Sequence, residues 1–370
     1  MIFSRSVEFN KETQRAQRAQ RVICKAPLCV LRVLCASALC LCAVACGDGR
    51  IPLTIYSPHG RDHLTLLEKD FERLHPDIDV RWLDLGSQEV LDRLRLEQVN
   101  PQADLWFGGP TTLFQRGVAE SLLAPYRPTW ADKVDSGGIG PHDFYYPAYR
   151  TPAIIAYNNI AVPDSLAPRD WDDVLRPEWY DKVLIRDPVA SGTMRAIWGL
   201  IIERGIRATG DTGWGMAWLR KLDGQTRTYT LSPALLDAKL ARQEGLVTLW
   251  DLPDILISRS KGMPFGYTFP SSGTAVIDDA IALVRNAPHP EAARLFYEYV
   301  GSVEGQLLAA DKVFRLPARH DLPADRVPAW VAEVERSMKV EPIDWNLLVK
   351  EGANWMGYWD QRVRNTGRPR

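Results

Sequence analysis

The chain has 370 residues, of which 46% are hydrophobic, and its formal net charge at pH 7 is −1. Residues 1–46 hold seven basic and two acidic residues, a net charge of +5, so the remaining 324 residues carry −6. This mild acidity argues against nucleic acid or an anionic membrane surface as a partner. A segment of this length exceeds one comfortable hydrophobic core, which predicts two lobes.

The basic leader has the features of an export signal. All six cysteines lie within it, at Cys24, Cys29, Cys35, Cys40, Cys42 and Cys46. A run of thirteen mostly apolar residues, 33–45, leads to Cys46, and Gly47 follows. The order of basic residues, apolar stretch and small residues predicts a lipoprotein signal peptide over residues 1–46, with Cys46 as the lipidated first residue of the exported protein. An ordinary secretory peptide or a single membrane anchor are the alternatives, although a spanning helix needs about 20 residues.

Short apolar runs alternate with helical patterns in the first part of the exported chain. The patterns predict strands over residues 51–56, 78–83 and 103–107, and helices over residues 61–75, 87–99 and 111–119. In the first of these helices, Leu64, Leu67, Phe71 and Leu74 recur at helical spacing, and Pro76 follows its end.

The second part repeats the alternation. Strands are predicted over residues 153–157, 183–185, 226–229, 246–250 and 280–284, and helices over residues 191–204, 233–243 and 291–300. The tail, residues 328–359, is predicted to be helical and is rich in Trp. Strands that alternate with helices through short connections indicate an α/β fold, with mostly parallel sheets flanked by helices.

Four predicted strand ends run directly into helix starts rich in glycine and hydroxyl residues. These segments are Ser57–Gly60, Gly86–Gln88, Gly108–Thr112 and Ser191–Thr193. Ligands of open α/β sheets bind outside the carboxyl ends of the strands. A helix N-terminus offers free N–H groups and partial positive charge. Each segment alone is explained by helix capping, but the four together predict an anion-binding cradle.

Three other groups of side chains are candidates for ligand contacts. His59 follows the first strand, and Trp250 and Asp251 end a buried one. The pair Tyr145–Tyr146 could bind ferric ion through its phenolates, but packing within a strand is the favoured interpretation.

Motifs of common enzymes are absent from the sequence. It contains no Gly-x-Ser-x-Gly elbow, no phosphate-binding Gly-x-x-x-x-Gly-Lys-Ser/Thr loop, no Gly-x-Gly-x-x-Gly and no His-Glu-x-x-His. The six histidines are scattered singly, so no zinc pattern is visible. The sequence therefore predicts a binding protein without enzymatic activity or a cofactor.

Several segments resemble type II periplasmic solute-binding proteins of ABC importers. The resemblance is carried by Tyr56–Gly60, Ala103–Gly109, Gly117–Pro125, Ala156–Asn158, Arg186–Thr193 and Asn286–Ala293, within residues 51–317. The most similar branch is the one that binds ferric iron, which also includes binders of phosphonates and sugar phosphates.

This resemblance implies a two-lobe, periplasmic-binding-protein-like α/β fold with the ligand cleft between the lobes. We expect residues 50–151 and 272–370, with the C-terminal helices, to form lobe 1 and residues 152–271 to form lobe 2. The chain should cross between the lobes near residues 151–153 and 269–274. The implied partners are a membrane permease and its ATPase, for a monomer anchored by lipid in the periplasm.

The iron-binding pattern is incomplete in this chain. Iron binders of the branch use a His after strand one, a Glu after the third strand and two adjacent Tyr in the second lobe. His59 matches the first ligand, Gly108 and Gly109 stand where the Glu is expected, and Trp250 and Asp251 replace the Tyr pair. If iron bound after all, His59 and Asp251 would be its remaining ligands.

The resemblance and the cradle together predict a small anionic solute, an organophosphate or phosphonate. Its predicted ligand-binding residues are Ser57, His59, Ser87, Thr111, Ser191, Gly192, Thr193, Trp250 and Asp251. Ferric iron binding for an iron transporter is the first alternative, and a sensor partner of a membrane receptor kinase is the second.

Overall fold

The computed structural model describes residues 49–367, so the predicted export signal and Cys46 lie outside the described residues. The structure divides the chain after Arg50, and the residues from Ile51 onward form one compact unit. No helix within residues 49–367 has the length and apolarity needed to cross a membrane.

Strands and helices alternate through most of this unit. The strands are β1 (Ile51–Ser57), β2 (Ile78–Asp84), β3 (Leu105–Pro110), β4 (Leu123–Ala124), β5 (Tyr146–Asn158), β6 (Val183–Arg186), β7 (Thr226–Thr230), β8 (Val247–Asp251), β9 (Phe265–Thr268), β10 (Val276–Val284) and β11 (Leu316–Pro317). The helices are α3 (Gly60–Leu74), α4 (Ser87–Leu96), α5 (Thr111–Ala119), α6 (Gly192–Thr209), α7 (Gly213–Gln225), α8 (Pro233–Ala241), α9 (Leu252–Ser260), α10 (Pro290–Gly301), α11 (Val303–Val313), α12 (Ala329–Ser337) and α13 (Trp345–Arg362).

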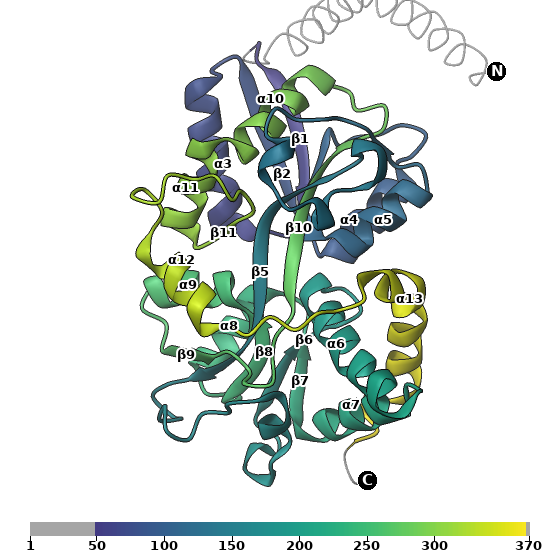
Figure 1. Ribbon diagram of the computed structural model, residues 1–370, viewed down its shortest axis with the longest axis vertical. Helices are drawn as coiled ribbons and strands as arrows, with labels where there is room; N and C mark the ends of the chain where they lie inside the picture. Colours follow the sequence, from purple (N-terminus) through teal and green to yellow (C-terminus); the bar gives the residue numbers. More distant parts are fainter. Residues whose placement is uncertain (1–48, 368–370) are drawn as a thin grey trace, which may run out of the picture. The chain divides into compact units, whose positions relative to one another are not determined.

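Two lobes share the long strand β5. The strand order is β2-β1-β3-β10-β5-β8-β6-β7, in which β5 pairs with β10 through Pro152 and with β8 from Ala153 onward. Figure 1 shows β5 and β10 running between the two halves of the unit. This arrangement confirms the predicted two-lobe α/β fold. The pairs β1–β2, β1–β3, β6–β7 and β6–β8 are parallel, whereas the pairs that β5 and β10 make are antiparallel.

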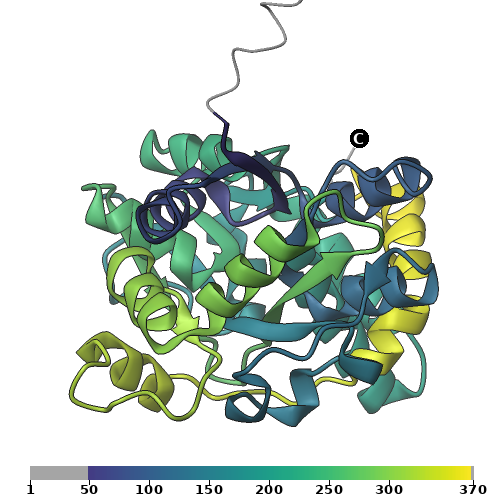
Figure 2. The same cartoon turned by 90° about the horizontal axis from the view of Figure 1, so that it is seen from above.

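Helices cover both faces of the sheet in the first lobe (Figure 2). Alternate residues of β3 enter different cores: Leu105 and Phe107 pack with Phe71 of α3, and Trp106 packs with Phe114 of α5. The Trp106 and Phe114 rings are stacked 4.0 Å apart. A strand whose successive side chains all meet apolar partners is typical of a sheet that is buried on both faces.

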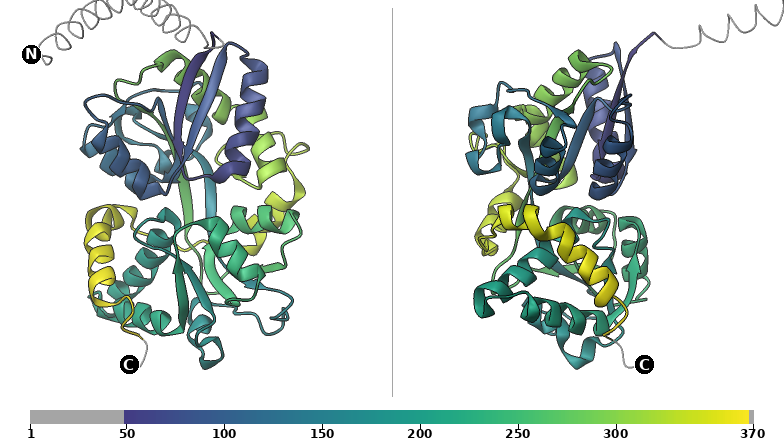
Figure 3. Two further views of the ribbon diagram at one scale, coloured as in Figure 1. Left: turned by 180° about the vertical axis from the view of Figure 1, so that it is seen from behind. Right: turned by 90° about the vertical axis from the view of Figure 1, so that its right-hand side faces the viewer.

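The predicted C-terminal tail forms two helices with an extended segment between them. We expected these helices to belong to the first lobe, but Trp355 and Trp359 of α13 lie in the same core as Trp198 of α6 in the second lobe. α13 also contacts α5 of the first lobe. Figure 3 shows α13, in yellow, starting beside the junction of the lobes and running along the second lobe. The physical reason is the Trp-rich face of α13, which the apolar face of α6 buries.

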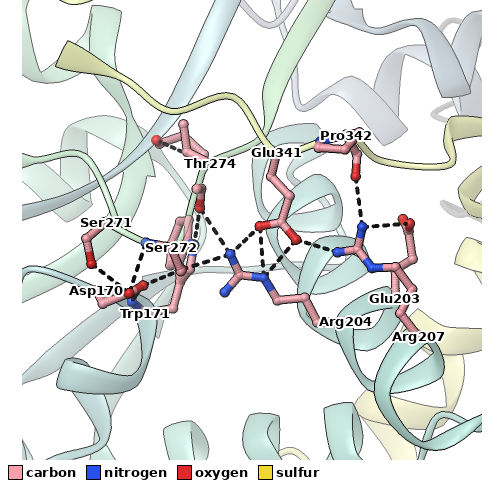
Figure 4. A network of polar contacts seen from close by, with 12 residues as sticks. Asp170, Trp171, Glu203, Arg204, Arg207, Ser271, Ser272, Thr274, Glu341 and Pro342 are labelled. Carbon is pink, nitrogen blue, oxygen red and sulfur yellow. Dashed lines mark hydrogen bonds and ion pairs between the residues drawn. The ribbon is translucent and has the colours of Figure 1, made fainter.

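Polar contacts fasten the extended segment before α13 to the second lobe (Figure 4). Glu341 accepts hydrogen bonds from both Arg204 and Arg207 of α6. Arg204 also donates to the hydroxyl of Ser272, 2.9 Å away, in the connection between β9 and β10. The backbone of Thr274 makes two hydrogen bonds with this segment. The Thr274 N–H donates to the carbonyl of Lys339, and the Glu341 N–H donates to the carbonyl of Thr274.

Candidate solute-binding cleft

A small cleft of about 180 Å³ lies where the carboxyl ends of strands from the two lobes meet. Residues at or just after the ends of β1, β2 and β3 line it from the first lobe, and residues at or just after the ends of β6, β7 and β8 line it from the second lobe. This is the position at which open α/β sheets bind ligands.

The structure brings seven of the nine predicted site residues to this cleft: His59, Ser87, Ser191, Gly192, Thr193, Trp250 and Asp251. The other two lie close behind it. Ser57 is fully buried, and its Oγ accepts a hydrogen bond from the His59 N–H at 3.2 Å. Thr111 begins α5, directly after the cleft residue Pro110, and lines a separate pocket.

The positive side of the cleft is built around the start of α6. Ser191 caps this helix, with its Oγ accepting the Met194 N–H at 3.3 Å. Arg186, at the end of β6, is buried, and its Nη1 donates to the carbonyl of Thr230 at 3.2 Å. Burial lowers the pKa of Arg186, although its ordinary value leaves it charged at neutral pH. A guanidinium and a helix N-terminus together favour an anion here.

The carboxylate next to Arg186 is already neutralised by another partner. Asp187 receives two hydrogen bonds from Nη2 of Arg364, both 2.9 Å long. Asp187 is thus hydrogen-bonded to Arg364 and not to Arg186, although its charge still acts on Arg186 together with those of Glu89 and Asp84.

The first-lobe wall contains a buried and uncharged histidine. The ring of His59 packs against Gly108. A Cβ added to Gly108 would lie 2.5 Å from Cε1 of the His59 ring. Burial lowers the pKa of His59 to about 4, and Arg315 acts in the same direction, while Asp279 at 3.8 Å opposes the shift. Neither ring nitrogen has a hydrogen-bond partner.

The second-lobe wall carries two carboxyl groups close together. Oδ1 of Asp251 accepts the Asp254 N–H at 3.1 Å, and Oδ2 accepts the Thr193 hydroxyl at 3.4 Å. Oδ2 of Asp254 accepts the indole N–H of Trp250 at 3.2 Å. Burial and repulsion from Asp254 raise the pKa of Asp251 well above its ordinary value. Burial also raises the pKa of Asp254, although Arg315 opposes that shift.

Sequence reasoning missed several residues that line the cleft: Asp84, Thr151, Arg186, Ser232, Asp279 and Arg315. The position at a strand end could have identified Asp84 and Arg186. Arg315 gave no local signal, because it lies on the short connection before β11, far from the other site residues in the sequence.

The two lobes touch each other at the rim of the cleft. The N–H of Gln88, in α4, donates to the carbonyl of Ala190 at 3.4 Å. On another side, Lys261 Nζ lies 2.5 Å from Asp62 Oδ2. The described conformation is therefore one in which the lobes are closed upon each other.

The tyrosine pair considered for iron lies elsewhere. Tyr145 and Tyr146 are buried, Tyr146 donates its hydroxyl to Asp143, and neither residue lines the cleft. Within residues 49–367, no group of three or more His, Cys, Asp or Glu could hold a metal ion.

Residues 100–351 match the family model of the bacterial extracellular solute-binding proteins. A protein assigned as an ABC transporter periplasmic-binding protein in Sinorhizobium fredii, y4fP, is 24% identical over 84% of this chain and 86% of its own length. A protein assigned as a 2-aminoethylphosphonate-binding periplasmic protein in Salmonella typhimurium is 26% identical over 67% of this chain and 72% of its own.

A solved structure shows the same fold. The periplasmic binding protein AfuA from Actinobacillus pleuropneumoniae, with exogenous fructose-6-phosphate bound, superimposes with a TM-score of 0.73 at 21% identity. The match covers 86% of this chain and all of AfuA.

Proposed function

The chain belongs to the bacterial extracellular solute-binding proteins, and we propose that the solute which it captures for its ABC importer is a small organic anion of the phosphonate or organophosphate type. Proteins of this family and fold are transport components without enzymatic activity. Binding, closure of the lobes and delivery to the permease and its ATPase are therefore the steps to be explained.

The observation that carries this proposal is the pairing of Arg186 with the N-terminus of α6. The guanidinium of Arg186 and the start of the helix, Ser191–Thr193, line the same cleft. Charge-assisted hydrogen bonds from a guanidinium are short and about twice as strong as neutral ones. Helix N-terminal N–H groups add further donors without needing a second positive charge.

Two of the compared proteins support an acidic, phosphorus-containing solute. The Salmonella typhimurium relative is assigned to 2-aminoethylphosphonate, and AfuA was solved with fructose-6-phosphate. Both ligands offer several acceptor oxygens on one phosphorus atom. Such a group suits the side of the cleft where Arg186 and the start of α6 provide hydrogen-bond donors.

We further propose that the protein works as a monomer in the periplasm, held to a membrane by a lipid on Cys46. The periplasmic location agrees with the compared relatives. The lipid anchor is supported by the apolar run that ends at Cys46.

Native mass spectrometry of the purified protein would identify a co-purified solute, and calorimetric titration would measure its affinity. Arg186→Met should weaken binding of a phosphonate by about 1.5–3 kcal/mol, the scale of a hydrogen bond to a charged group. Arg227→Met removes an exposed arginine on the neighbouring strand β7 and should leave the affinity unchanged.

Three results would contradict the proposal. Equal binding by wild type and Arg186→Met would place the acidic group elsewhere. A stoichiometric visible absorption band with ferric citrate would favour the iron-binding alternative. If the protein binds the solute normally but its deletion leaves solute uptake unchanged, the sensor alternative is favoured.

A further inference from the structure

The turn between β6 and α6 joins the two groups that form the positive side of the cleft. Arg186 ends β6, and Ser191 caps α6. The residue that organises the turn is Asp187. Its carbonyl accepts the Ser191 N–H at 3.0 Å, and its Oδ1 accepts the Val189 N–H at 2.8 Å. An Asp side chain that accepts an N–H two residues further on is a common way to fix a turn.

The carboxylate of Asp187 also brings a negative charge close to the proposed anion site. Burial lowers the pKa of Arg186, and the charge of Asp187 acts against that shift, so the two neighbours interact. A carboxylate with an unbalanced charge would repel a bound anion, and it would do so strongly where water is scarce. The turn therefore needs the oxygen atoms of Asp187 as acceptors, whereas anion binding needs its charge to be balanced.

Arg364, far away in the sequence, balances this charge. Its Nη2 donates to both carboxylate oxygens of Asp187, at 2.9 Å each. The side chains of Asp187 and Arg364 are only 10% and 22% exposed. Hydrogen bonds between ionised groups are about twice as strong as neutral ones. Removal of one partner from a buried ion pair leaves the other charge uncompensated. The Arg364 guanidinium also lies 2.9 Å from Asp360, which is more exposed.

The tail that carries Arg364 is fastened to the second lobe. The guanidinium lies over the rings of Trp359 and Tyr229, 4.7 and 5.2 Å from their centroids. Directly after it, the Asn365 N–H donates to Oδ1 of Asp223 at 2.9 Å. Packing and hydrogen bonds on both sides of Arg364 therefore hold its guanidinium at one position, as is needed for a group that orients another.

Arg364 itself has no place in the lining of the cleft. It lines a separate pocket, together with Asp223 and Tyr229. Its effect on a solute in the cleft would therefore pass through Asp187 and the turn that Asp187 organises.

We propose that Arg364, in the tail after α13, is a positioning residue for solute binding, which acts through Asp187 on the turn that presents Arg186 and the start of α6. The role of Arg364 rests on the proposed function, because the turn serves the acidic group of the solute. The C-terminal tail thereby contributes to the second-lobe half of the binding site, although it contacts no part of the cleft.

Hydrogen–deuterium exchange of the solute-free protein tests the effect on the turn without any ligand. Arg364→Met should speed the exchange of amides in residues 187–194 by roughly fivefold or more, since exchange follows the free energy of local opening. Arg362→Met is the matched control, because it removes an exposed arginine from the same tail, two residues earlier. It should leave the exchange of this segment unchanged.

Calorimetric titration with methylphosphonate and with glycerol 3-phosphate tests the effect on binding. For each probe that binds the wild type, Arg364→Met should weaken binding by about fivefold or more, and Arg362→Met should not, because coupling of this size is found between members of one hydrogen-bond network. Thermal melts would confirm that both variants are folded at the temperature of the titration.

A second substitution separates action through Asp187 from a general loosening of the tail. Asp187→Asn keeps an oxygen that can accept the Val189 N–H and removes the charge. The double variant Arg364→Met/Asp187→Asn should therefore bind within about twofold of the wild type. A role of Arg364 in packing alone predicts no such rescue, because the contacts with Trp359 and Tyr229 are still lost.

Each other outcome has a definite meaning. Unchanged exchange in Arg364→Met, or faster exchange with unchanged affinity, overturns the positioning role and leaves the anion proposal standing. So does a double variant that binds as weakly as Arg364→Met, or an equal loss of affinity in Arg362→Met. If neither probe binds the wild type, the anion proposal is overturned and the role of Arg364 falls with it.

Discussion

A Cβ added to Gly192 would lie 2.5 Å from Cδ of Pro110, a distance that real Cβ atoms do not reach. Gly192 begins α6 in the second lobe, and Pro110 ends β3 in the first. The same Cβ would lie 2.8 Å from Oγ of Ser87. Gly192, which the sequence predicts as a ligand-binding residue, lines the cleft and is also approached closely by the opposite lobe.

Gly192→Val should therefore prevent the lobes from closing fully. We expect the affinity for the solute to fall at least tenfold, because contacts from the first lobe are lost, while the fold stays intact. Calorimetry would measure the affinity, and small-angle scattering would show a larger radius of gyration with solute present.

Gly352→Val is the control for this variant. Gly352 lies in α13, and a Cβ there would meet no atom within 4 Å. Wild-type affinity and a normal compaction on binding by Gly192→Val would contradict the assigned role of the Gly192–Pro110 contact.

Thr193→Ala should weaken solute binding by about 1.5–3 kcal/mol, tenfold or more in affinity. The Thr193 hydroxyl reaches Asp251 at 3.4 Å, a weak hydrogen bond from which it can turn toward an acceptor on the solute. Thr193→Ser keeps the hydroxyl and should keep most of the affinity. If both variants bind equally well, the hydroxyl does not contact the solute.

The main architecture was predictable because it depends on local periodicity. The apolar spacing of Leu64, Leu67 and Phe71 gives α3, and all three residues are buried in the core. Two helices, α7 and α11, were not predicted from the sequence. The tail was expected to be helical as a whole, but residues 338–344 are extended, since their backbone pairs with Thr274 instead.

The site was predictable only where strand ends meet helix starts. That rule found His59, Ser87 and Ser191, which all line the cleft. It could not find Arg315 or Asp279, because their approach to the cleft depends on how the chain returns to the first lobe after β9. The number of carboxyl groups in the cleft was also not predicted, because they come from distant segments of both lobes.

Cys46→Ser should release the protein from membranes into the soluble fraction or leave its precursor uncleaved. The prediction rests on the apolar run of residues 33–45 before the cysteine. Fractionation of cells, followed by detection of the protein and of incorporated labelled lipid, would measure this. Processing and fractionation identical to the wild type would rule out lipidation at Cys46.

Acid should destabilise the protein through its buried histidines. His63 has no exposed surface, and burial, His59 and Arg315 hold its pKa well below the ordinary value. An unfolded chain protonates histidine near pH 6.5. Below that pH the unfolded state binds more protons than the folded state, so the free energy of unfolding falls with falling pH.

His63→Leu should reduce this loss by about 2.5 kcal/mol between pH 7 and pH 4.5, the linkage of one such group over the two pH units below pH 6.5. Urea unfolding followed by Trp fluorescence at the two pH values would measure it. His320→Leu, at an exposed position, should lose as much stability as the wild type. The same loss in His63→Leu would mean that carboxyl groups dominate the acid response.

Trp359→Ala should be strongly destabilising, because this side chain joins α13 to the core of the second lobe. Trp359 is fully buried and meets Trp198 and Tyr229 edge to face, with ring centroids 5.8 and 5.4 Å away. The guanidinium of Arg364, which also holds Asp187, lies 4.7 Å above its ring. Truncation of a buried Trp costs about 3–5 kcal/mol of unfolding free energy.

Tyr358→Ala, at the neighbouring position with 51% exposure, should cost less than about 1 kcal/mol. Urea unfolding would measure the free energy of unfolding of both variants. If Trp359→Ala cost as little as Tyr358→Ala, the packing of α13 against α6 would not contribute to the stability of the second lobe.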